Sequence, residues 1–139
     1  MEITANALQT VQENQNVLFT ETPVSANCSM VHRDGSGLVT LRGMTQQCRA
    51  RFKVTFGGNV AIPTGGEVVP ISLAIALNGE AVGPTTMTVT PTVVEAFFNV
   101  FSAIYIDVPA GCCTQISIKN ISTGVISVQN ANLIVERVA

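Results

Sequence analysis

The chain has 139 residues, close to the commonest size of one folded domain, so a second domain is not expected. Charged residues make up only 12% of it, against about 25% in an ordinary soluble domain. Either the surface is rich in Ser, Thr, Asn and Gln, or, as we favour, much of it is covered by identical neighbours. The net charge is −2, and the chain has only seven Lys and Arg residues. This is too few for a basic surface that binds a phosphate backbone, so no nucleic-acid partner is expected.

The first sixteen residues have no basic segment followed by an apolar run, so they do not resemble a signal peptide. No other stretch approaches the roughly 18 uninterrupted apolar residues of a membrane span, so no membrane partner is expected. Residues 2–14 could form a turn or two of helix, although their Thr, Asn and Val content suits an extended arm equally well. We therefore expect an N-terminal arm at residues 1–16 that docks onto a partner, followed by one folded domain at residues 17–139.

Alternation of apolar and polar residues with a period of two dominates the rest of the chain and predicts β-strands throughout. In residues 48–56, for example, Phe52 and Phe56 share one face while Arg51 and Lys53 share the other. Shorter strands are expected at residues 17–20, 28–32, 38–42, 114–119, 125–128 and 133–138. Together with the two runs described next, this makes about ten short strands, as expected of a sandwich or a barrel.

A second alternating run covers residues 69–77 and is followed directly by Asn78 and Gly79. An Asn-Gly pair is the residue pair that a tight hairpin turn prefers, because both positions need a positive φ. The next strand, through Met87 and Val89, should therefore return antiparallel to the first.

The most informative run covers residues 94–108, because both of its faces carry large apolar groups. One face must fill the core, and the other then needs a cover that a lone sandwich would not supply. Two explanations are open: a long bent strand whose halves bury opposite faces, or a face whose aromatic residues meet their copies at a symmetry axis. We favour the second explanation and predict a subunit interface that contains Phe97, Phe101 and Tyr105.

The sequence offers little for catalysis, because it holds one histidine and no clustered carboxylates. His32, Asp34 and Ser36 lie close together, but Asp-Gly and Ser-Gly pairs are more simply a turn that closes a hairpin. The glycine pairs 57–58 and 65–66 are expected in loops, since no Lys-Ser/Thr and no helix follow them as in a phosphate loop. We expect no enzyme activity, no cofactor and no dedicated metal site, while a metal held on a threefold axis stays open.

The four cysteines show neither zinc-ligand spacing nor the framework of a secreted disulfide protein. Cys112 and Cys113 are adjacent and could join only through a strained ring, so free thiols are expected, while a bridge between Cys28 and Cys48 stays open. No basic residue near Cys112 in the sequence would activate it, so both adjacent cysteines are expected to pack as small residues at a strand start. This cysteine usage is typical of a chain that folds in a reducing cytoplasm.

Four segments together resemble a known group of proteins. They are Ile-Ser-Leu-Ala-Ile-Ala-Leu-Asn-Gly at residues 71–79, the Gly-Pro turn at 83–84, Asp-Val-Pro-Ala-Gly at 107–111 and Gln-Asn-Ala-Asn-Leu-Ile-Val at 129–135. With the strand spacing, they resemble the tumour necrosis factor-like and complement-like jelly rolls of bacteria and their phages. Within that group the chain is most similar to small full-length proteins of Firmicutes genomes and gut phage-like elements, and more distantly to the tip domains of collagen-like spore-surface filaments.

The resemblance covers about residues 17–139 and implies an antiparallel jelly-roll sandwich of about ten strands that assembles as a tight homotrimer. It also implies that aromatic side chains of the Phe97, Phe101 and Tyr105 kind lie at the threefold seam. No Gly-X-Y tract precedes the domain, which departs from the spore-filament proteins.

The first functional hypothesis is therefore a non-enzymatic structural protein of a phage particle, a capsid decoration, cement or head-fibre trimer on the virion surface. Its arm, residues 1–16, would dock onto the capsid or another virion structural protein. The second is a trimeric module that binds a surface glycan through residues 57–66 or 79–86. It ranks lower because the chain has no Trp and its one Tyr, Tyr105, is expected inside a buried strand. A component of the bacterial spore surface is the third hypothesis.

Overall fold

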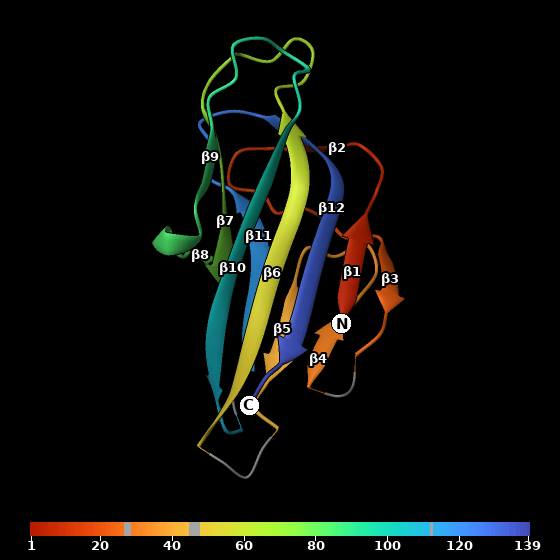
Figure 1. Ribbon diagram of the computed structural model, residues 1–139, viewed down its shortest axis with the longest axis vertical. Coiled ribbons are helices and arrows are strands. Elements are labelled where there is room, and N and C mark those ends of the chain that lie inside the picture. Colours follow the sequence, from red (N-terminus) through yellow and green to blue (C-terminus); the bar gives the residue numbers. More distant parts are fainter. Residues whose placement is uncertain (27–28, 45–47, 112) are drawn as a thin grey trace.

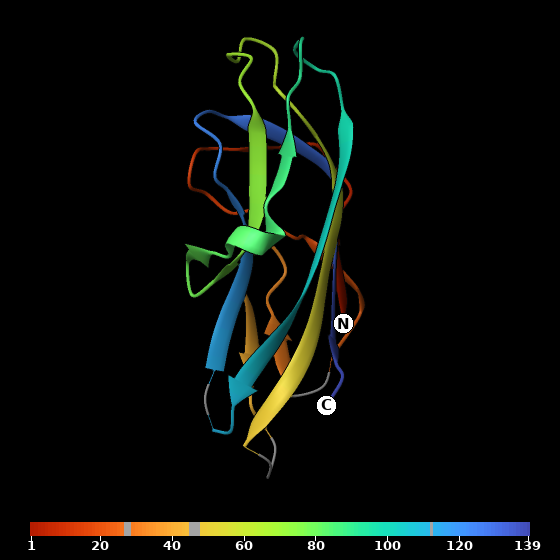
Figure 2. The same ribbon diagram turned by 60° about the vertical axis from the view of Figure 1, so that its left-hand side comes forward.

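Two antiparallel sheets lie face to face around one hydrophobic core (Figure 1, Figure 2). The computed structural model describes residues 1–26, 29–44, 48–111 and 113–139. These residues form twelve strands and one 3₁₀ turn, η1 (Gly83–Thr85), and they contain no α-helix. The prediction of an all-β antiparallel sandwich is confirmed, with twelve described strands in place of about ten.

Sheet A is the layer that faces the viewer in Figure 1. Its strands are, in spatial order, β10 (Phe98–Pro109), β6 (Arg49–Ala61), β12 (Ile126–Arg137), β1 (Glu2–Ala5) and β3 (Glu21–Val24), and β2 (Gln9–Val11) pairs with β12. Sheet B lies behind it. Its order is β4 (Met30–His32), β5 (Val39–Arg42), β11 (Cys113–Asn120), β7 (Ile71–Leu77) and β8 (Glu80–Ala81), and β9 (Met87–Val89) pairs with β7.

The core is built from the inward positions of these alternating strands. Along β6, Phe52, Val54 and Phe56 are fully buried, whereas Lys53 between them is on the outer side, as the period of two predicts. The rings of Phe56 and Phe19 meet edge to face with their centroids 6.4 Å apart, the arrangement that aromatic quadrupoles favour. The interior therefore holds the apolar face of every long strand, and the opposite faces are left for solvent or partners.

Residues 1–16 do not form an arm outside the domain, and this corrects the expected boundary at residue 17. β1 lies between β12 and β3 in the middle of sheet A, and β2 pairs with the start of β12. Ile3, Ala5 and Val11 are buried in the core. β1 has two buried residues and β2 has one, so their alternation is too short to stand out from a polar sequence.

Residues 17–20 were expected as a strand, but the strand in this region is β3, four residues later. Val17 and Phe19 are nonetheless fully buried. Their backbone N–H groups donate to the carbonyls of Ile118 and Ser36 at 2.8 and 3.2 Å. The segment crosses from one sheet to the other, so it buries apolar side chains without forming a continuous ladder.

The expected hairpin after residues 69–77 is confirmed. Asn78 and Gly79 both have positive φ angles, 51° and 87°, and they join β7 to β8. β9 then pairs antiparallel with β7, with Met87 opposite Leu73. The residue types at the turn predicted the hairpin, but the strand that directly follows the turn is the short β8, which was not expected, and β9 comes after η1.

Two further expectations are corrected. Gly57 and Gly58 lie inside β6 and not in a loop, whereas Gly65 and Gly66 lie in the β6–β7 connection, as expected. The two strands expected near the C-terminal end are one strand, β12, which is interrupted by a bulge between Gln129 and Asn132. A bulge bends a strand and shifts its alternation by one residue, so the pattern reads as two strands.

Candidate interface on the outer face of sheet A

The two faces of β10 have opposite environments along the whole strand. Val100, Ile106 and Val108 face inward and are buried, while Phe101 and Tyr105 face outward with 66% and 63% of their surface exposed. The same face is buried at both ends, so the alternative of a bent strand whose halves bury opposite faces is wrong. Phe97 was expected on this strand, but it lies just before β10, with 44% exposed.

A band without charged side chains crosses β10, β6 and β12 at the level of Phe101, while Tyr105 lies in a charged row below it, with Lys53 and Glu136. Phe101 lies opposite Gly57, and Gly57 in turn lies opposite Asn132 on β12. In the next row, Ala103, Thr55 and Ile134 are aligned on the same three strands. A charge-depleted centre that contains aromatic residues is typical of the core of a protein interface.

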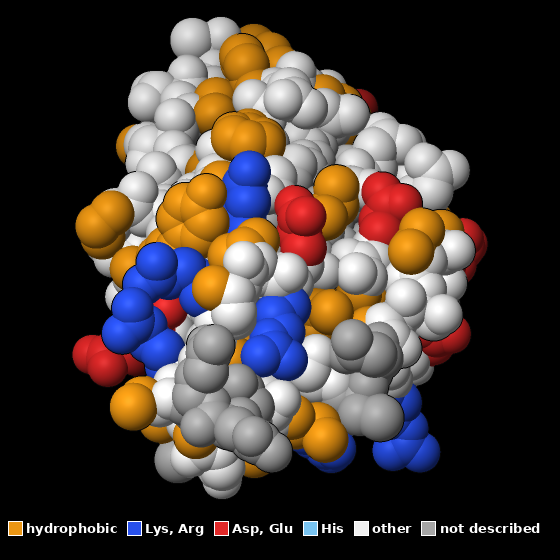
Figure 3. Space-filling model, turned by 60° about the horizontal axis from the view of Figure 1, so that its bottom comes forward, with side chains coloured by type: hydrophobic (Ala, Val, Ile, Leu, Met, Phe, Trp, Pro, Cys, Tyr) orange, Lys and Arg blue, Asp and Glu red, His pale blue; other side chains and the backbone are white. Residues whose placement is uncertain are grey.

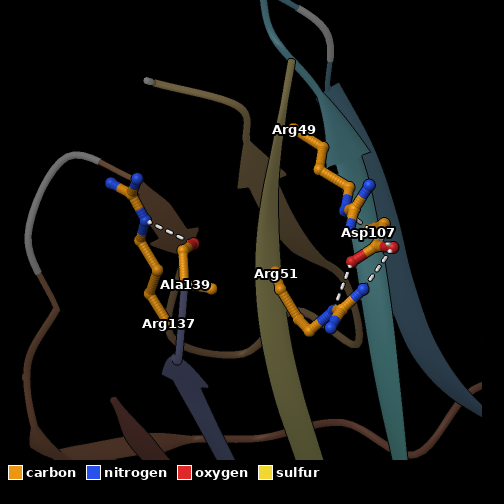
Figure 4. A network of polar contacts seen from close by, with 5 residues as sticks. All are labelled: Arg49, Arg51, Asp107, Arg137 and Ala139. Atoms are coloured by element: carbon orange, nitrogen blue, oxygen red, sulfur yellow. Dashed lines mark hydrogen bonds and ion pairs between the residues drawn. The ribbon is translucent and has the colours of Figure 1, made fainter. Parts of the chain in front are cut away.

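An ionic cluster borders this band at the lower end of β10 and β6 (Figure 4). The Arg51 guanidinium donates two hydrogen bonds to the Asp107 carboxylate, from Nε at 2.8 Å and from a terminal nitrogen at 3.1 Å. Arg49 approaches the same carboxylate from the other side, with its Nε at 3.3 Å. The hydrogen bonds from Arg51 hold the pKa of Asp107 below its ordinary value of 3.8, and they raise the pKa of Arg51.

A row of four asparagine side chains borders the band at its upper end. The Asn99 Nδ2 group donates to Asn59 Oδ1, Asn59 Nδ2 to Asn130 Oδ1 and Asn130 Nδ2 to Asn6 Oδ1, at 3.2, 3.0 and 2.7 Å. The row connects β10, β6 and β12 to the loop after β1. Because each amide is hydrogen-bonded to the next, each side chain fixes the orientation of its neighbour. Sequence reasoning missed this row and the ionic cluster, because their members lie 40 to 124 residues apart in the chain.

The exposed Tyr105 ring also lines a depression of about 480 Å³, together with Arg51, Asp107, Val138 and Ala139. This corrects the expectation that Tyr105 is inside a buried strand, since its side chain is on the outer surface of the isolated chain. An exposed ring beside a carboxylate and a guanidinium offers one apolar face and several hydrogen-bonding groups.

His32, Asp34 and Ser36, which were considered for catalysis, lie at the turn between β4 and β5. His32 ends β4, and β5 follows in an antiparallel pair, with Gly35 at a φ of 91° in between. The His32 Nε2 atom lies 3.0 Å from the Ser36 carbonyl, and its Nδ1 atom lies 3.8 Å from the Asp34 carboxylate. The Ser36 hydroxyl instead accepts the Leu38 N–H at 3.0 Å. No hydrogen bond is described between His32 and the Ser36 hydroxyl, so the described residues do not assemble a nucleophile with its base.

The described cysteines and acidic residues form no metal centre. Cys48 and Cys113 are free and exposed, while Cys28 and Cys112 lie outside the described residues. In the described part of the chain, no three His, Cys, Asp or Glu residues come together as ligands. Within the same residues, no helix is long and apolar enough to span a membrane.

Comparison with known proteins identifies the fold. No protein-family model and no curated protein matches the chain. Among solved structures, the globular domain of zebrafish complement 1qA protein is similar, with a TM-score of 0.61 and 12% identity, over 96% of this chain and 93% of that domain. The EclA C-terminal domain, described as a sugar-binding protein, has a TM-score of 0.45 and 10% identity, over 95% of this chain and 79% of that one.

A third structure, the CBM35 module of Cellvibrio japonicus Abf62, has a TM-score of 0.33 and 13% identity, over 96% of this chain and 99% of that one. TM-scores below 0.5 do not establish a shared fold, so neither the EclA domain nor this module defines the fold of the chain. An identity of 12% to the complement domain establishes the fold and leaves function open. The chain therefore has the jelly-roll fold of a C1q globular domain.

Proposed function

We propose that this chain is a non-enzymatic structural protein that assembles as a homotrimer through the outer face of sheet A and belongs to the surface of a phage particle. The single observation that carries the trimer is the exposure of Phe101 in a band without charged side chains, with a second exposed ring, Tyr105, further along the same face of β10. Two large exposed aromatic side chains on one face are costly to leave in water, at about 25 cal/mol per Å² of apolar surface. Neighbouring copies around a threefold axis would provide the apolar cover.

The assignment to a virion rests on the resemblance of residues 71–79 and 129–135 to jelly rolls of phages and Firmicutes. In that role the trimer would decorate or cement the capsid, or form a head fibre. Because β1 and β2 are strands of sheet A, contact with the particle is proposed for the outer surface of the trimer and not for a projecting arm. A spore-surface role is the alternative location.

The first test is the solution mass of the purified chain by light scattering, for the wild type and for Phe101→Asp. The wild type should have the mass of three chains, and the variant should have the mass of one, because a carboxylate in the band would be desolvated without a partner. Val31→Asp is the matched control, since Val31 is exposed on β4 in the other sheet, and it should remain a trimer. A wild-type monomer or dimer would overturn the homotrimer.

The particle is tested separately. An antibody against the chain should label phage particles that are released by cells carrying the gene, as seen in electron micrographs. Labelling of spores alone would replace the virion by the spore surface, and labelling of neither would overturn a particle role.

A second candidate function is glycan binding, and the observation that favours it is the 480 Å³ depression that combines the Tyr105 ring with Arg51 and Asp107. Sugars bind by stacking on aromatic rings while their hydroxyls bond to planar polar groups. A glycan array would identify a ligand, and Tyr105→Ala separates the two functions. Loss of glycan binding with an unchanged solution mass supports the glycan site, whereas a fall in mass supports Tyr105 as an interface residue.

A further inference from the structure

The outer face of sheet A is divided into two halves of opposite charge. Over β10 and β6, Arg49 and Arg51 share the single carboxylate of Asp107, and Lys53 is a third cation, placed opposite Tyr105 on β10. Over β12, β1 and β3, the charged side chains on the same face are acidic in the described residues. They are Glu136, Glu2 and Glu21.

In Figure 3, most Lys and Arg side chains lie on the left and in the centre, with a further group at the lower right, and most acidic side chains lie in the centre and to the right, with one group at the left edge. Arg137, at the lower end of β12, is engaged elsewhere, because its guanidinium donates to the carbonyls of Met44 and Ala139. It follows Glu136 in β12, so its side chain starts on the opposite side of the strand from the acidic row. A net charge of only −2 for the whole chain conceals this separation.

The acidic half contains a depression of about 270 Å³. Its lining is formed by Met1, Glu2, Val24, Ile134, Val135 and Glu136. Ile134 and Val24 are exposed apolar residues, and the two glutamates provide acidic groups beside them. Glu136 lies opposite Lys53 in the β12–β6 ladder without an ion pair among the described residues, and the Glu2 carboxylate accepts the Asn132 amide. The N-terminal ammonium of Met1 is also part of the lining and donates to the Val135 carbonyl at 2.8 Å. The depression is thus an apolar hollow with two carboxylates and one ammonium group on its lining.

The basic half carries the complementary shape. The exposed Tyr105 ring lies directly opposite Lys53 in the β10–β6 register, and Arg51 is the next outward residue along β6. The ring lies beside Lys53 and beside Arg51, which is bound to Asp107, in a half with three cations and one carboxylate. Its shape and the net positive charge of this half match an apolar hollow that carries two glutamates.

We propose that Tyr105 of one copy, with Lys53 and Arg51 beside it, docks into the depression between Glu2 and Glu136 of the next copy. This inference rests on the proposed homotrimer and specifies how its copies join. The ring is on β10 and the depression is over β12, β1 and β3, so one copy can use both at the same time. Each copy then presents its ring to one neighbour and its depression to the other. Such a head-to-tail contact closes into a ring of subunits when the rotation between them is a third of a turn.

Mixing two variants tests this contact directly. Tyr105→Ala removes the ring, while Ile134→Lys places a cation in the depression against Arg51 and Lys53. Each variant alone should be a monomer. Mixed one to one, they retain a single intact contact, from the Tyr105 of the second variant to the depression of the first, and native mass spectrometry should detect a heterodimer that does not grow further.

A heterodimer in the mixture supports the contact, and two monomers that do not associate overturn it. If Phe101→Asp dissociates the trimer but either of these two variants remains trimeric, the homotrimer stands and this contact is wrong. If the wild type is itself a monomer, the proposed function fails first. Circular dichroism melts of both variants establish whether each is folded before they are mixed.

A milder pair of substitutions keeps the test decisive if Ile134→Lys does not fold. Glu2→Gln with Glu136→Gln should raise the dissociation constant of the trimer about tenfold at low ionic strength, and the difference should shrink at about 1 M salt, where charges are screened. Glu13→Gln with Glu80→Gln is the matched control, because both residues are exposed and away from this face. Equal dissociation constants for the two double variants would overturn the contact.

Discussion

Phe101 lies directly opposite Gly57 in the β10–β6 ladder, yet its ring does not cover the glycine. A methyl group added at Gly57 would have only the Val100 carbonyl oxygen within 4 Å, at 3.9 Å. Aromatic residues across from a glycine often fold over it and shield its backbone. Here both the ring and the glycine stay open on the outer face, which is the arrangement expected where a second molecule covers them.

Substitution of the two adjacent glycines of β6 should have opposite effects on folding. Gly57→Ala should raise the free energy of unfolding by about 0.5 to 1 kcal/mol, because alanine loses less backbone entropy in a strand and the space is empty. Gly58→Ala should lower it, since the new methyl would stand 3.3 Å from the Phe56 ring and 3.5 Å from the Ala131 Cα. Urea unfolding of both variants measures this, and a destabilised Gly57→Ala would contradict the open outer face.

The Asp107 carboxylate should titrate below the ordinary value of 3.8 because it accepts two hydrogen bonds from Arg51. A lowered folded-state pKa contributes stability that is present above the unfolded value and is lost as the pH falls through the folded one. Arg51→Gln should therefore raise the pKa of Asp107, and the stability difference from the wild type should disappear in acid. Carboxyl carbon chemical shifts, followed by NMR through the titration, report the pKa, and an unchanged value in Arg51→Gln would refute the pairing.

Asn120 holds the segment after β2 against sheet B and should tolerate substitution poorly. Its buried amide Nδ2 donates to the carbonyls of Val11, Gln12 and Gly124 at 3.1 to 3.2 Å, and its Oδ1 accepts the Ser122 N–H. Asn120→Asp would turn a carboxylate toward three carbonyls and should cost about 3 kcal/mol or more.

The control for Asn120 is Asn99→Ala in the exposed row on sheet A, which should change stability by no more than about 0.5 kcal/mol. Chemical denaturation gives both values. Hydrogen exchange should show the loss of protection spreading to β2 in Asn120→Asp, and equal costs for the two variants would argue against the anchoring role.

Substitution of two leucines at β5 would test which side chains form the core. Leu41 on β5 is fully buried, and Leu38 just before β5 is 39% exposed. Leu41→Ala should cost about 2 to 5 kcal/mol because it leaves a cavity between the sheets, while Leu38→Ala should cost much less. Thermal and urea unfolding would distinguish them, and similar losses would mean that the sandwich packs differently.

The sequence determined the class of fold because alternation with a period of two is a local property of each strand. It predicted the inward faces of β6 and β10 from residues within each run, since neighbouring side chains in a strand must point to opposite sides. It also predicted the hairpin at Asn78 and Gly79, because those two residue types accept the φ angles of that turn. The uncovered aromatic face of β10 was visible for the same reason.

Only the tertiary structure decided which strands become neighbours. Asp107 was isolated along the chain, and its pairing with Arg51 required the register of β10 against β6. The sequence does not reveal β1 as a strand, because its two buried residues carry little signal until β12 and β3 pair on either side of it. The hollow between Glu2 and Glu136 likewise joins residues from the two ends of the chain. Strand pairing is set by the closure of the whole core, so surface sites built across strands cannot be predicted from local pattern alone.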